Sequence, residues 1–187
     1  MSSVKILGKD YNRIMRTMRN FVAKNESRKA LNYIRLESTP SIEGSSLVAV
    51  GLDGFVLAKI IVPIIHELGA EYTPFEALIS ITPSTKAEYV VISQEDDETI
   101  IEYVGLYAIS YSRIKETYIN WKHIMPDDRK STYEIFVNPH LLAKALSTYP
   151  QDAKSIALRF GLNLEPILLE RYGEDDQLLV LPVRTCR

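Results

Sequence analysis

The amino-acid sequence predicts an α+β fold built from repeated strand–helix–strand–strand–strand modules, with helices on one face of antiparallel sheets. Three observations support this fold class. Near the N-terminus a short apolar run precedes residues whose apolar members recur at helical spacing. Several stretches with the period-2 alternation of half-buried strands come next. The same order of elements returns in the last third of the chain, which indicates an architectural repeat.

The first predicted module starts with a strand over residues 5–7 and a helix over residues 11–24, capped by Asp10. Strands follow over residues 30–36, 47–50 and 55–62. Asp53-Gly54, between the last two, is a strong turn signal. The apolar stripe of the helix consists of Tyr11, Ile14, Met18, Phe21 and Val22.

The middle of the chain is predicted to hold one short helix and then two strands. The helix would begin at Thr73 and Pro74 and end near residue 78, since Thr82 and Pro83 lie close behind it. Residues 88–93 and 99–112 alternate as strands, with the acidic run 94–98 as the hairpin tip. Residues 115–126 are predicted to be irregular, with Tyr118, Trp121, Ile124 and Met125 as anchors.

The last third is predicted to repeat the first module. A strand over residues 132–137 leads to Asn138 as a helix cap and Pro139 in the first turn. The helix would end near Tyr149, and strands are predicted over residues 155–160, 166–170 and 178–183, with a turn at 173–176. We expect one domain over residues 1–126, with a reduced second helix, and a half-domain over residues 127–187 packed on it.

Composition limits the class of protein. The 187 residues are 46% hydrophobic and 25% charged, which is enough for one ordinary core, or for one core and a smaller satellite. The one cysteine, Cys186, is expected to be an ordinary thiol in a reducing compartment. No run approaches the roughly 20 apolar residues that span a bilayer, and the first residues lack the apolar stretch of a signal peptide. We therefore expect a cytoplasmic protein with no membrane partner.

Charge is distributed unevenly along the chain. Residues 1–35 carry nine basic and two acidic side chains, a net charge of +7, whereas the whole chain carries −2. The remainder must therefore carry −9. This asymmetry indicates a basic binding face on an otherwise acidic body. The alternative is a chance distribution that serves only solubility.

Catalytic patterns are not found in the sequence. The three histidines His66, His123 and His140 do not have metal-ligand spacing, and there is no phosphate-binding loop or nucleophile elbow. The acidic clusters at 95–98 and 174–176 have the composition of solvated hairpin tips; the alternative is that they chelate a divalent ion. We predict no catalytic residue, no metal and no cofactor; a small hydrolase has almost no residue to support it.

Several short motifs, in this order, resemble the bacterial sliding-clamp family, the beta subunit of DNA polymerase III. Residues 52–58, LDGFVLA, resemble the family's T-D-G-x-R-L-A turn. Residues 107–112, YAISYS, followed by 118–126, YINWKHIMP, resemble a strand leading into F/Y-P-D-Y/W-x-x-V-I/L-P. Residues 136–146 resemble the family's last helix, and 179–184, LVLPVR, resemble its terminal hydrophobic-x-P-[MVI]-R. A full clamp subunit has three domains of two modules each, so the resemblance implies a shortened member.

The resemblance implies duplex DNA as a partner and the first helix as its contact. Arg13, Arg16, Asn20 and Lys24 fall on the helix face opposite the apolar stripe. No acidic residue occurs from residue 11 to residue 25. A sliding clamp lines its ring with such helices, which contact phosphates without reading bases. The alternative is a solvated helix face, although such faces normally mix both signs of charge.

The resemblance also implies a hydrophobic pocket for short peptides from polymerases or repair proteins. The matching residues are Gly54, Phe55, Leu57, Ile119, His123, Ile124, Leu181, Pro182, Val183 and Arg184. Two alternatives stay open: Phe55 fills the pocket itself, or Leu181 and Val183 are core residues.

The function predicted first is a non-catalytic clamp-like protein that forms homo-oligomers through strand edges, binds duplex DNA and tethers partners. The alternative function is a clamp-fold interaction module without ring closure or DNA binding.

Overall fold

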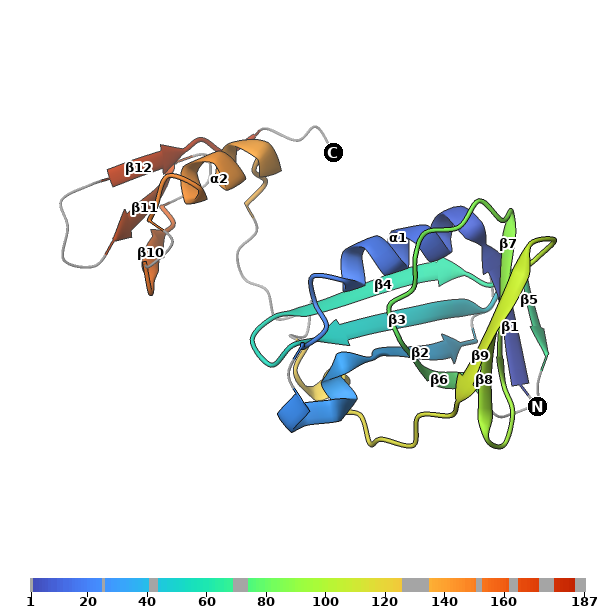
Figure 1. Cartoon of the computed structure of the whole chain (residues 1–187). Coiled ribbons are helices and arrows are strands. Elements are labelled where there is room, and N and C mark those ends of the chain that lie inside the picture. The colour runs from blue at the N-terminus through green and yellow to red at the C-terminus, as the bar shows by residue number, and fades with distance from the viewer. Residues whose placement is uncertain are drawn as a thin grey trace. The chain divides into compact units, whose positions relative to one another are not determined.

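The structure is a computed structural model that describes residues 2–24, 26–40, 44–68, 74–125, 135–150, 153–161, 165–171 and 177–183, without the side chains of 26–28, 67–68 and 171. The chain divides into two compact units, Met1–Met125 and Pro126–Arg187, and each is described by itself (Figure 1). None of the described helices is long and apolar enough to cross a membrane.

Unit 1 contains two antiparallel sheets. One has the strand order β4-β3-β2-β6, and the other has the order β5-β1-β7-β8-β9. The elements are β1 (Ser2–Leu7), α1 (Gly8–Met18), the 3-10 helix η1 (Glu26–Asn32), β2 (Ile34–Thr39), β3 (Ser46–Leu52), β4 (Leu57–Pro63), β5 (His66–Leu68), β6 (Glu76–Ile79), β7 (Tyr89–Gln94), β8 (Glu98–Tyr103), β9 (Tyr107–Ser112) and the 3-10 helix η2 (Trp121–His123).

The two sheets exchange one strand each. Strand β1 pairs with β7 along its whole length, from Ser2 opposite Gln94 to Leu7 opposite Tyr89. Strand β6 pairs with β2, with Ile34 opposite Ile79. Unit 1 therefore consists of two interlocked halves: a strand that joins the other half's sheet, a connection, and three antiparallel strands. In the first half the connection contains α1, and in the second half it is the segment of residues 80–88.

The predicted helix near Thr73 and Pro74 is wrong for the described residues, because residues 76–79 form strand β6. Ala77, Leu78 and Ile79 are buried in the four-stranded sheet, and that burial outweighs the weak helix propensity of so short a segment. Residues 80–88, which contain Pro83, take the helix's place in the chain order without forming one. Thr73 lies outside the described residues.

Helix α1 is shorter than predicted and is shifted toward the N-terminus. It begins at Gly8, its flanking Leu7 makes no side-chain cap, and Asp10 lies within the first turn, where a negative charge is favourable to the helix dipole. The helix ends at Met18, after which the chain turns so that Ala23 N–H donates to the Leu31 carbonyl oxygen at 2.9 Å. The buried residues of α1 are Gly8, Tyr11, Ile14, Met15 and Met18.

The remaining strands of unit 1 are confirmed with adjusted bounds. The strand expected over residues 99–112 is a hairpin, β8 and β9, and the turn between them contains Gly105 at a φ of +77°, a conformation that favours glycine. The strand expected from residue 30 starts at Ile34, because the preceding residues belong to η1. The strand expected from Phe55 starts at Leu57.

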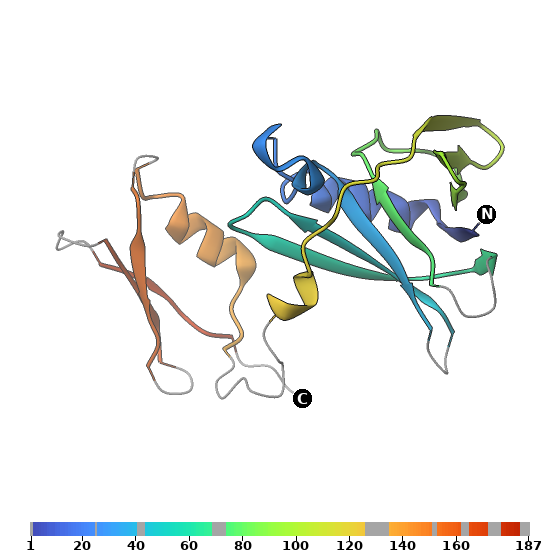
Figure 2. The same cartoon turned by 90° about the horizontal axis from the view of Figure 1, so that it is seen from below.

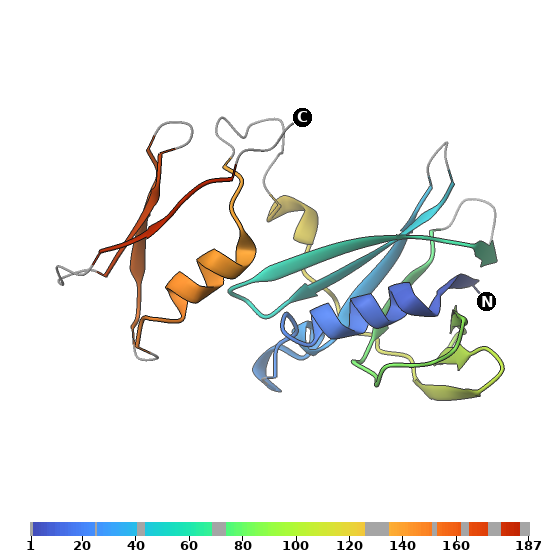
Figure 3. The same cartoon turned by 90° about the horizontal axis from the view of Figure 1, so that it is seen from above.

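Two layers cover opposite faces of the four-stranded sheet. Helix α1 and the five-stranded sheet enclose the main core on one face, where Ile34, Leu36 and Ala49 are buried. On the other face, which we call the outer face, the chain after β9 crosses the strands and ends in η2, as the yellow segment in Figure 2 shows. Figure 3 shows α1 on the side turned away from that segment. Trp121 of η2 packs on Val48 and Val50 of β3.

Unit 2 contains α2 (Pro139–Leu146) and an antiparallel sheet of β10 (Ile156–Arg159), β11 (Ile167–Arg171) and β12 (Gln177–Val180), in that order. The predicted cap is confirmed, since Asn138 Oδ1 accepts the His140 N–H at 2.9 Å and Pro139 opens the helix. The helix ends three residues before the expected Tyr149. Residues 132–134 and the expected turn at 173–176 lie outside the described residues, as do the acidic cluster 174–176 and Cys186.

Candidate functional site

The solvent side of α1 carries only basic charge among its exposed side chains. Lys9, Arg13 and Arg16 are exposed and recur at i, i+4 and i+7, so they form one stripe along the helix. We call this stripe the basic face. Arg19, directly after the helix, is also exposed. Within the described part of the chain, none of these side chains lies at ion-pair distance from an acid.

Arg13 is held in place by the neighbouring sheet. Its Nη2 donates to the carbonyl oxygen of Ile61 on β4 at 2.9 Å, while the side chain stays exposed. One donor of the guanidinium is thereby used to fix its position, and the other N–H groups remain available for a further acceptor. A guanidinium fixed in this way loses little conformational entropy when it binds an anion.

Asn20 and Lys24 are exposed, as the predicted DNA contact requires, but they do not lie on the helix. Since α1 ends at Met18, both belong to the chain that leads to η1. The prediction that they continue the helical face is therefore wrong. The chain leaves the helix after Met18, where it lies close to β3. A Cβ at Gly51 of β3 would lie 2.8 Å from the Met18 sulfur.

Residues 80–88, which we call the rail, run alongside α1. Asn12 donates through Nδ2 to the Thr85 carbonyl oxygen and accepts the Thr85 N–H at Oδ1, both at 2.8 Å. Gly8 N–H donates to the Glu88 carbonyl oxygen at 2.7 Å. The rail was not predicted from the sequence. The sequence signal for it was Asn12, because asparagine is a poor helix former. In the middle of a helix its side-chain amide is expected to hydrogen-bond to a neighbouring segment.

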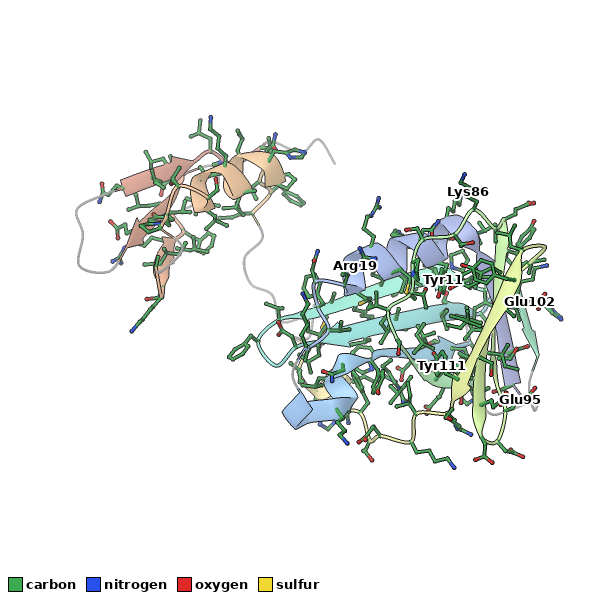
Figure 4. All side chains as sticks on the ribbon, in the orientation of Figure 1. Tyr11, Arg19, Lys86, Glu95, Glu102 and Tyr111 are labelled. Atoms are coloured by element: carbon green, nitrogen blue, oxygen red, sulfur yellow. The ribbon has the colours of Figure 1, made fainter. Side chains whose placement is uncertain are left out.

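Three buried hydroxyls join the rail, α1 and β8. Tyr11 and Thr82 lie 2.6 Å apart between their hydroxyl oxygens, and the Tyr103 hydroxyl donates to Thr82 at 3.0 Å. Burial raises the pKa of Tyr11 well above its ordinary value. Tyr11 therefore keeps its proton and serves packing rather than proton transfer. Figure 4 shows Tyr11 pointing to the interior, while Lys86 lies beside the N-terminal half of α1.

The turn between β3 and β4 holds three of the predicted peptide-binding residues. Asp53 Oδ1 accepts the N–H groups of Phe55 at 2.8 Å and Val56 at 2.9 Å, and these bonds hold the pKa of that carboxyl below its usual value. Gly54 has a φ of +104°, which the tight turn requires. Phe55 is 97% exposed, so the alternative in which it fills a pocket is wrong. The Asp53 bonds hold the backbone so that this ring points into solvent.

Leu57 connects this turn to the segment after β9. It packs on the cluster of Val48, Val50 and Trp121. In the same segment Ile119, His123 and Ile124 are exposed, so Ile124 is not the anchor predicted for it. The structure thus brings both predicted groups of unit 1 to the same cluster, with exposed apolar side chains around it. Lys59 and Lys122 lie over the Trp121 ring, each 5.5 Å from its centroid.

The predicted peptide-binding residues of the tail belong to unit 2. Leu181 is 65% exposed and Val183 is 45% exposed, so the interpretation of both as core residues is wrong. Pro182 is half-buried and forms a β-bridge with Val137, and Val183 N–H donates to the Phe136 carbonyl oxygen at 2.8 Å. These backbone contacts hold the tail extended while its side chains remain accessible. Arg184 lies outside the described residues.

A polar cleft of about 480 Å³ lies elsewhere in unit 1 and includes none of the predicted site residues. Its walls carry both signs of charge. They are formed by Arg35, Glu76, Ala77, Leu78, Gln94, Asp96, Arg113, Ile114, Lys115 and Glu116. This group was not predicted from the sequence, because its members are far apart in the chain. Across the described ranges, no three His, Cys, Asp or Glu side chains are grouped so as to hold a metal ion.

Comparison with known proteins identifies the fold. No family model and no curated protein matches the sequence. Among solved structures, the Helicobacter pylori beta clamp bound to a DNA ligase peptide matches 96% of this chain and 49% of its own, with a TM-score of 0.76 and 13% identity. The Pseudomonas aeruginosa sliding clamp gives 0.76, 14% identity and coverages of 96% and 51%. The Caulobacter crescentus beta sliding clamp gives 0.74, 20% identity and coverages of 96% and 49%.

These matches confirm, at the level of the fold, the resemblance that the sequence motifs indicated. The chain has the α+β sliding-clamp fold of bacterial DNA polymerase III beta subunits. It spans about half the length of these clamp chains.

Proposed function

We propose that this chain is a non-catalytic, sliding-clamp-like protein that binds duplex DNA without sequence preference and tethers partner proteins through a short peptide. The observation that carries the proposal is the basic face of α1, which bears no exposed acid, on a sliding-clamp fold. No step of chemistry is required of such a protein. Its work is to hold nucleic acid and a partner together.

The DNA contact follows from the charge and reach of the basic side chains. Lys9, Arg13 and Arg16 extend from one side of a helix, where they meet phosphates rather than base edges. Phosphate contacts release counterions, so binding weakens with salt by about 0.9 in log–log slope for each contact. With about four contacts the slope is roughly −3 to −4.

The test is fluorescence anisotropy of a short labelled duplex over a salt series. Reversing charge at Arg13, Arg16 and Lys24 together (R13E, R16E, K24E) is expected to abolish binding at low salt. A matched control reverses three exposed lysines of other elements, Lys115, Lys144 and Lys154, and changes the net charge equally. The control is expected to bind more tightly than the first variant. Equal loss in both variants, or no binding by the wild-type chain at low salt, contradicts the DNA role.

The peptide role is supported by exposed apolar side chains at the positions that match the clamp motifs. Phe55, Ile119 and Ile124 are exposed on the two chain segments whose Leu57, Tyr118 and Met125 pack on the Trp121 cluster, and Leu181 and Val183 are exposed in unit 2. Anchoring a short peptide needs apolar contacts with a few polar groups at the rim. Two solved structures of the same fold hold ligands: the Helicobacter pylori clamp a DNA ligase peptide, and the Bartonella birtlesii clamp griselimycin.

A second candidate function is an interaction module of the same fold that neither closes a ring nor binds DNA. The exposed side chain of Phe55 favours it, because that feature is independent of the basic face. The two candidates separate on two measurements. DNA binding together with self-association supports the first, and peptide binding by a monomer that ignores DNA supports the second.

A further inference from the structure

The rail follows α1 in the antiparallel direction over two turns of the helix. Glu88 bonds to Gly8, Thr85 to Asn12, and Thr82 N–H to the Met15 sulfur at 3.5 Å. A Cβ at Gly8 would lie 1.9 Å from the Ala87 carbonyl oxygen, so the two backbones are in direct contact. The rail therefore has a defined position along the helix, set by bonds at three successive points.

The rail lies beside the basic face. Gly8, Asn12 and Met15, which contact the rail, form one stripe at i, i+4 and i+7. Lys9, Arg13 and Arg16 each follow a member of that stripe by one residue, and one residue is about 100° around a helix. The basic face thus has the rail along one flank. On its other flank Arg13 bonds to the Ile61 carbonyl oxygen of β4.

Lys86 is the basic residue of the rail. Thr85, held by Asn12, is half-buried and Ala87 is buried, whereas Ser84 and Lys86 are exposed. Within the described residues Lys86 has no acid at ion-pair distance. Figure 4 shows its side chain directed away from the body of unit 1, next to the N-terminal half of α1. The exposed acid of the rail, Glu88, lies at its end beside Gly8.

We infer that Lys86 is a further DNA-binding residue, and that Asn12 is a positioning residue that holds the rail so that Lys86 extends the basic face. The inference rests on the proposed function. With Lys86 included, the DNA-contacting surface consists of the helix α1 and the adjacent rail. The rail is held against α1 by hydrogen bonds to its backbone. Its Lys86 adds one phosphate contact to those that the helix provides.

The test compares Lys86→Gln with a matched lysine in duplex binding over a salt series. Lys115→Gln is the control, since Lys115 is exposed in the same unit but lies in the chain after β9. Loss of one phosphate contact lowers the magnitude of the log–log slope by about 1 and the affinity at low salt by about three- to tenfold. Lys86→Gln is expected to show both effects, and Lys115→Gln neither.

Asn12 is tested by coupling to Lys86. If Asn12 acts by holding the rail, Asn12→Ala lowers the slope about as much as Lys86→Gln, and the double variant lowers it no further. If Asn12 has only a structural role, Asn12→Ala leaves the slope unchanged, or its effect on the slope adds to that of Lys86→Gln in the double variant. Either result overturns the positioning role. Circular dichroism of each variant shows that the fold is kept.

The failure of this inference is distinguishable from failure of the proposed function. A wild-type slope for Lys86→Gln, with binding still lost in R13E/R16E/K24E, overturns the role of Lys86 alone. An equal loss for Lys115→Gln also overturns it, because the effect is then one of net charge. Absence of DNA binding by the wild-type chain overturns both.

Discussion

Glu37 on β2 and Lys122 on η2 form an ion pair of 2.8 Å that joins the four-stranded sheet to the chain after β9. The two partners differ in environment, since the side chain of Glu37 is 9% exposed and that of Lys122 is 63% exposed. Arg35 continues the network, at 3.6 Å from Glu37 and 2.7 Å from Glu76. Lys122 thus helps to hold the segment that carries Ile119, His123 and Ile124 against the outer face.

We expect Lys122→Met to lower the stability of unit 1 by about 1 kcal/mol, because it leaves a buried carboxylate with only Arg35 as a partner. The matched control is Lys115→Met, which removes an ion pair with Asp97 whose two side chains are both highly exposed and which is expected to cost nothing measurable. Trp121 is the only tryptophan of the chain and lies in unit 1. Urea unfolding followed by its fluorescence therefore reports on this unit. Equal costs for both variants would show that burial of Glu37 does not matter.

Gly8→Ala is expected to destabilise unit 1 by about 1–3 kcal/mol through overpacking. The added methyl group would meet the Ala87 carbonyl oxygen, a backbone atom that cannot rotate away. A glycine-to-alanine change within an ordinary helix has the opposite sign, because alanine favours the helix. Tryptophan fluorescence gives the stability, and amide hydrogen exchange is expected to rise along the rail. A stabilised variant would contradict the contact between the two backbones.

Sequence reasoning predicted most of unit 1 because its elements follow local rules. The apolar run of residues 47–50 and the Asp53-Gly54 turn predict β3 and the hairpin to β4, and both are present. The clamp resemblance also came from short local motifs. Asn138 and Pro139 predicted the start of α2, since capping depends on neighbours in sequence.

The parts that sequence reasoning missed depend on contacts between distant residues. Residues 76–79 form a strand because β2, about forty residues earlier, supplies its partners. The end of α1 is set by β3 near Gly51, and the rail by Asn12. Exposure of Phe55 and Val183 was likewise not predictable, because an apolar residue type does not tell a core position from a binding surface.

Stability is expected to fall as pH rises from about 10 to about 12. Burial raises the pKa of Tyr111 to about 12 and that of Tyr118 to about 12, whereas an unfolded tyrosine ionises near 10. The folded chain keeps these protons to higher pH, so their contribution is complete below about pH 10 and is lost as the pH rises toward the folded pKa. Tyr118→Phe should lose less stability over this interval than wild type. Fluorescence-detected unfolding at several pH values gives the comparison.

Self-association is expected through the free edge of β9. Arg113 N–H donates to the Asp97 carbonyl oxygen, and hydrogen-bonded pairs alternate along the β8–β9 hairpin, so Ala108 and Ser110 direct their N–H groups away from β8. Ala108→Pro removes one of these donors and is tolerated only at such an edge. Light scattering of the wild-type chain should give a multiple of 21.3 kDa, and Ala108→Pro should give a lower mass with unchanged circular dichroism. A wild-type monomer at high concentration would favour the second candidate function.

The tail is expected to tolerate a charge without loss of stability and to lose peptide binding. Val183 is 45% exposed, so Val183→Asp should barely move the melting temperature of unit 2 in far-ultraviolet circular dichroism. Val180, three residues earlier and 3% exposed, is the matched control, because Val180→Asp buries an unpaired charge and should cost several kcal/mol.

The binding partner is a Gln-Leu-x-Leu-Phe peptide, the class that the clamp resemblance implies. Micromolar affinity, about −8 kcal/mol, is measurable by titration calorimetry. The binding heat should vanish in Val183→Asp. It should fall in Phe55→Ala, and the melting temperature of that variant should not change, because the Phe55 ring lies in solvent. A scrambled peptide is the control. If the wild-type chain at high concentration gives no more heat with the Gln-Leu-x-Leu-Phe peptide than with the scrambled one, the peptide role is wrong for Phe55 and Val183 alike. The exposed apolar side chains then need another partner.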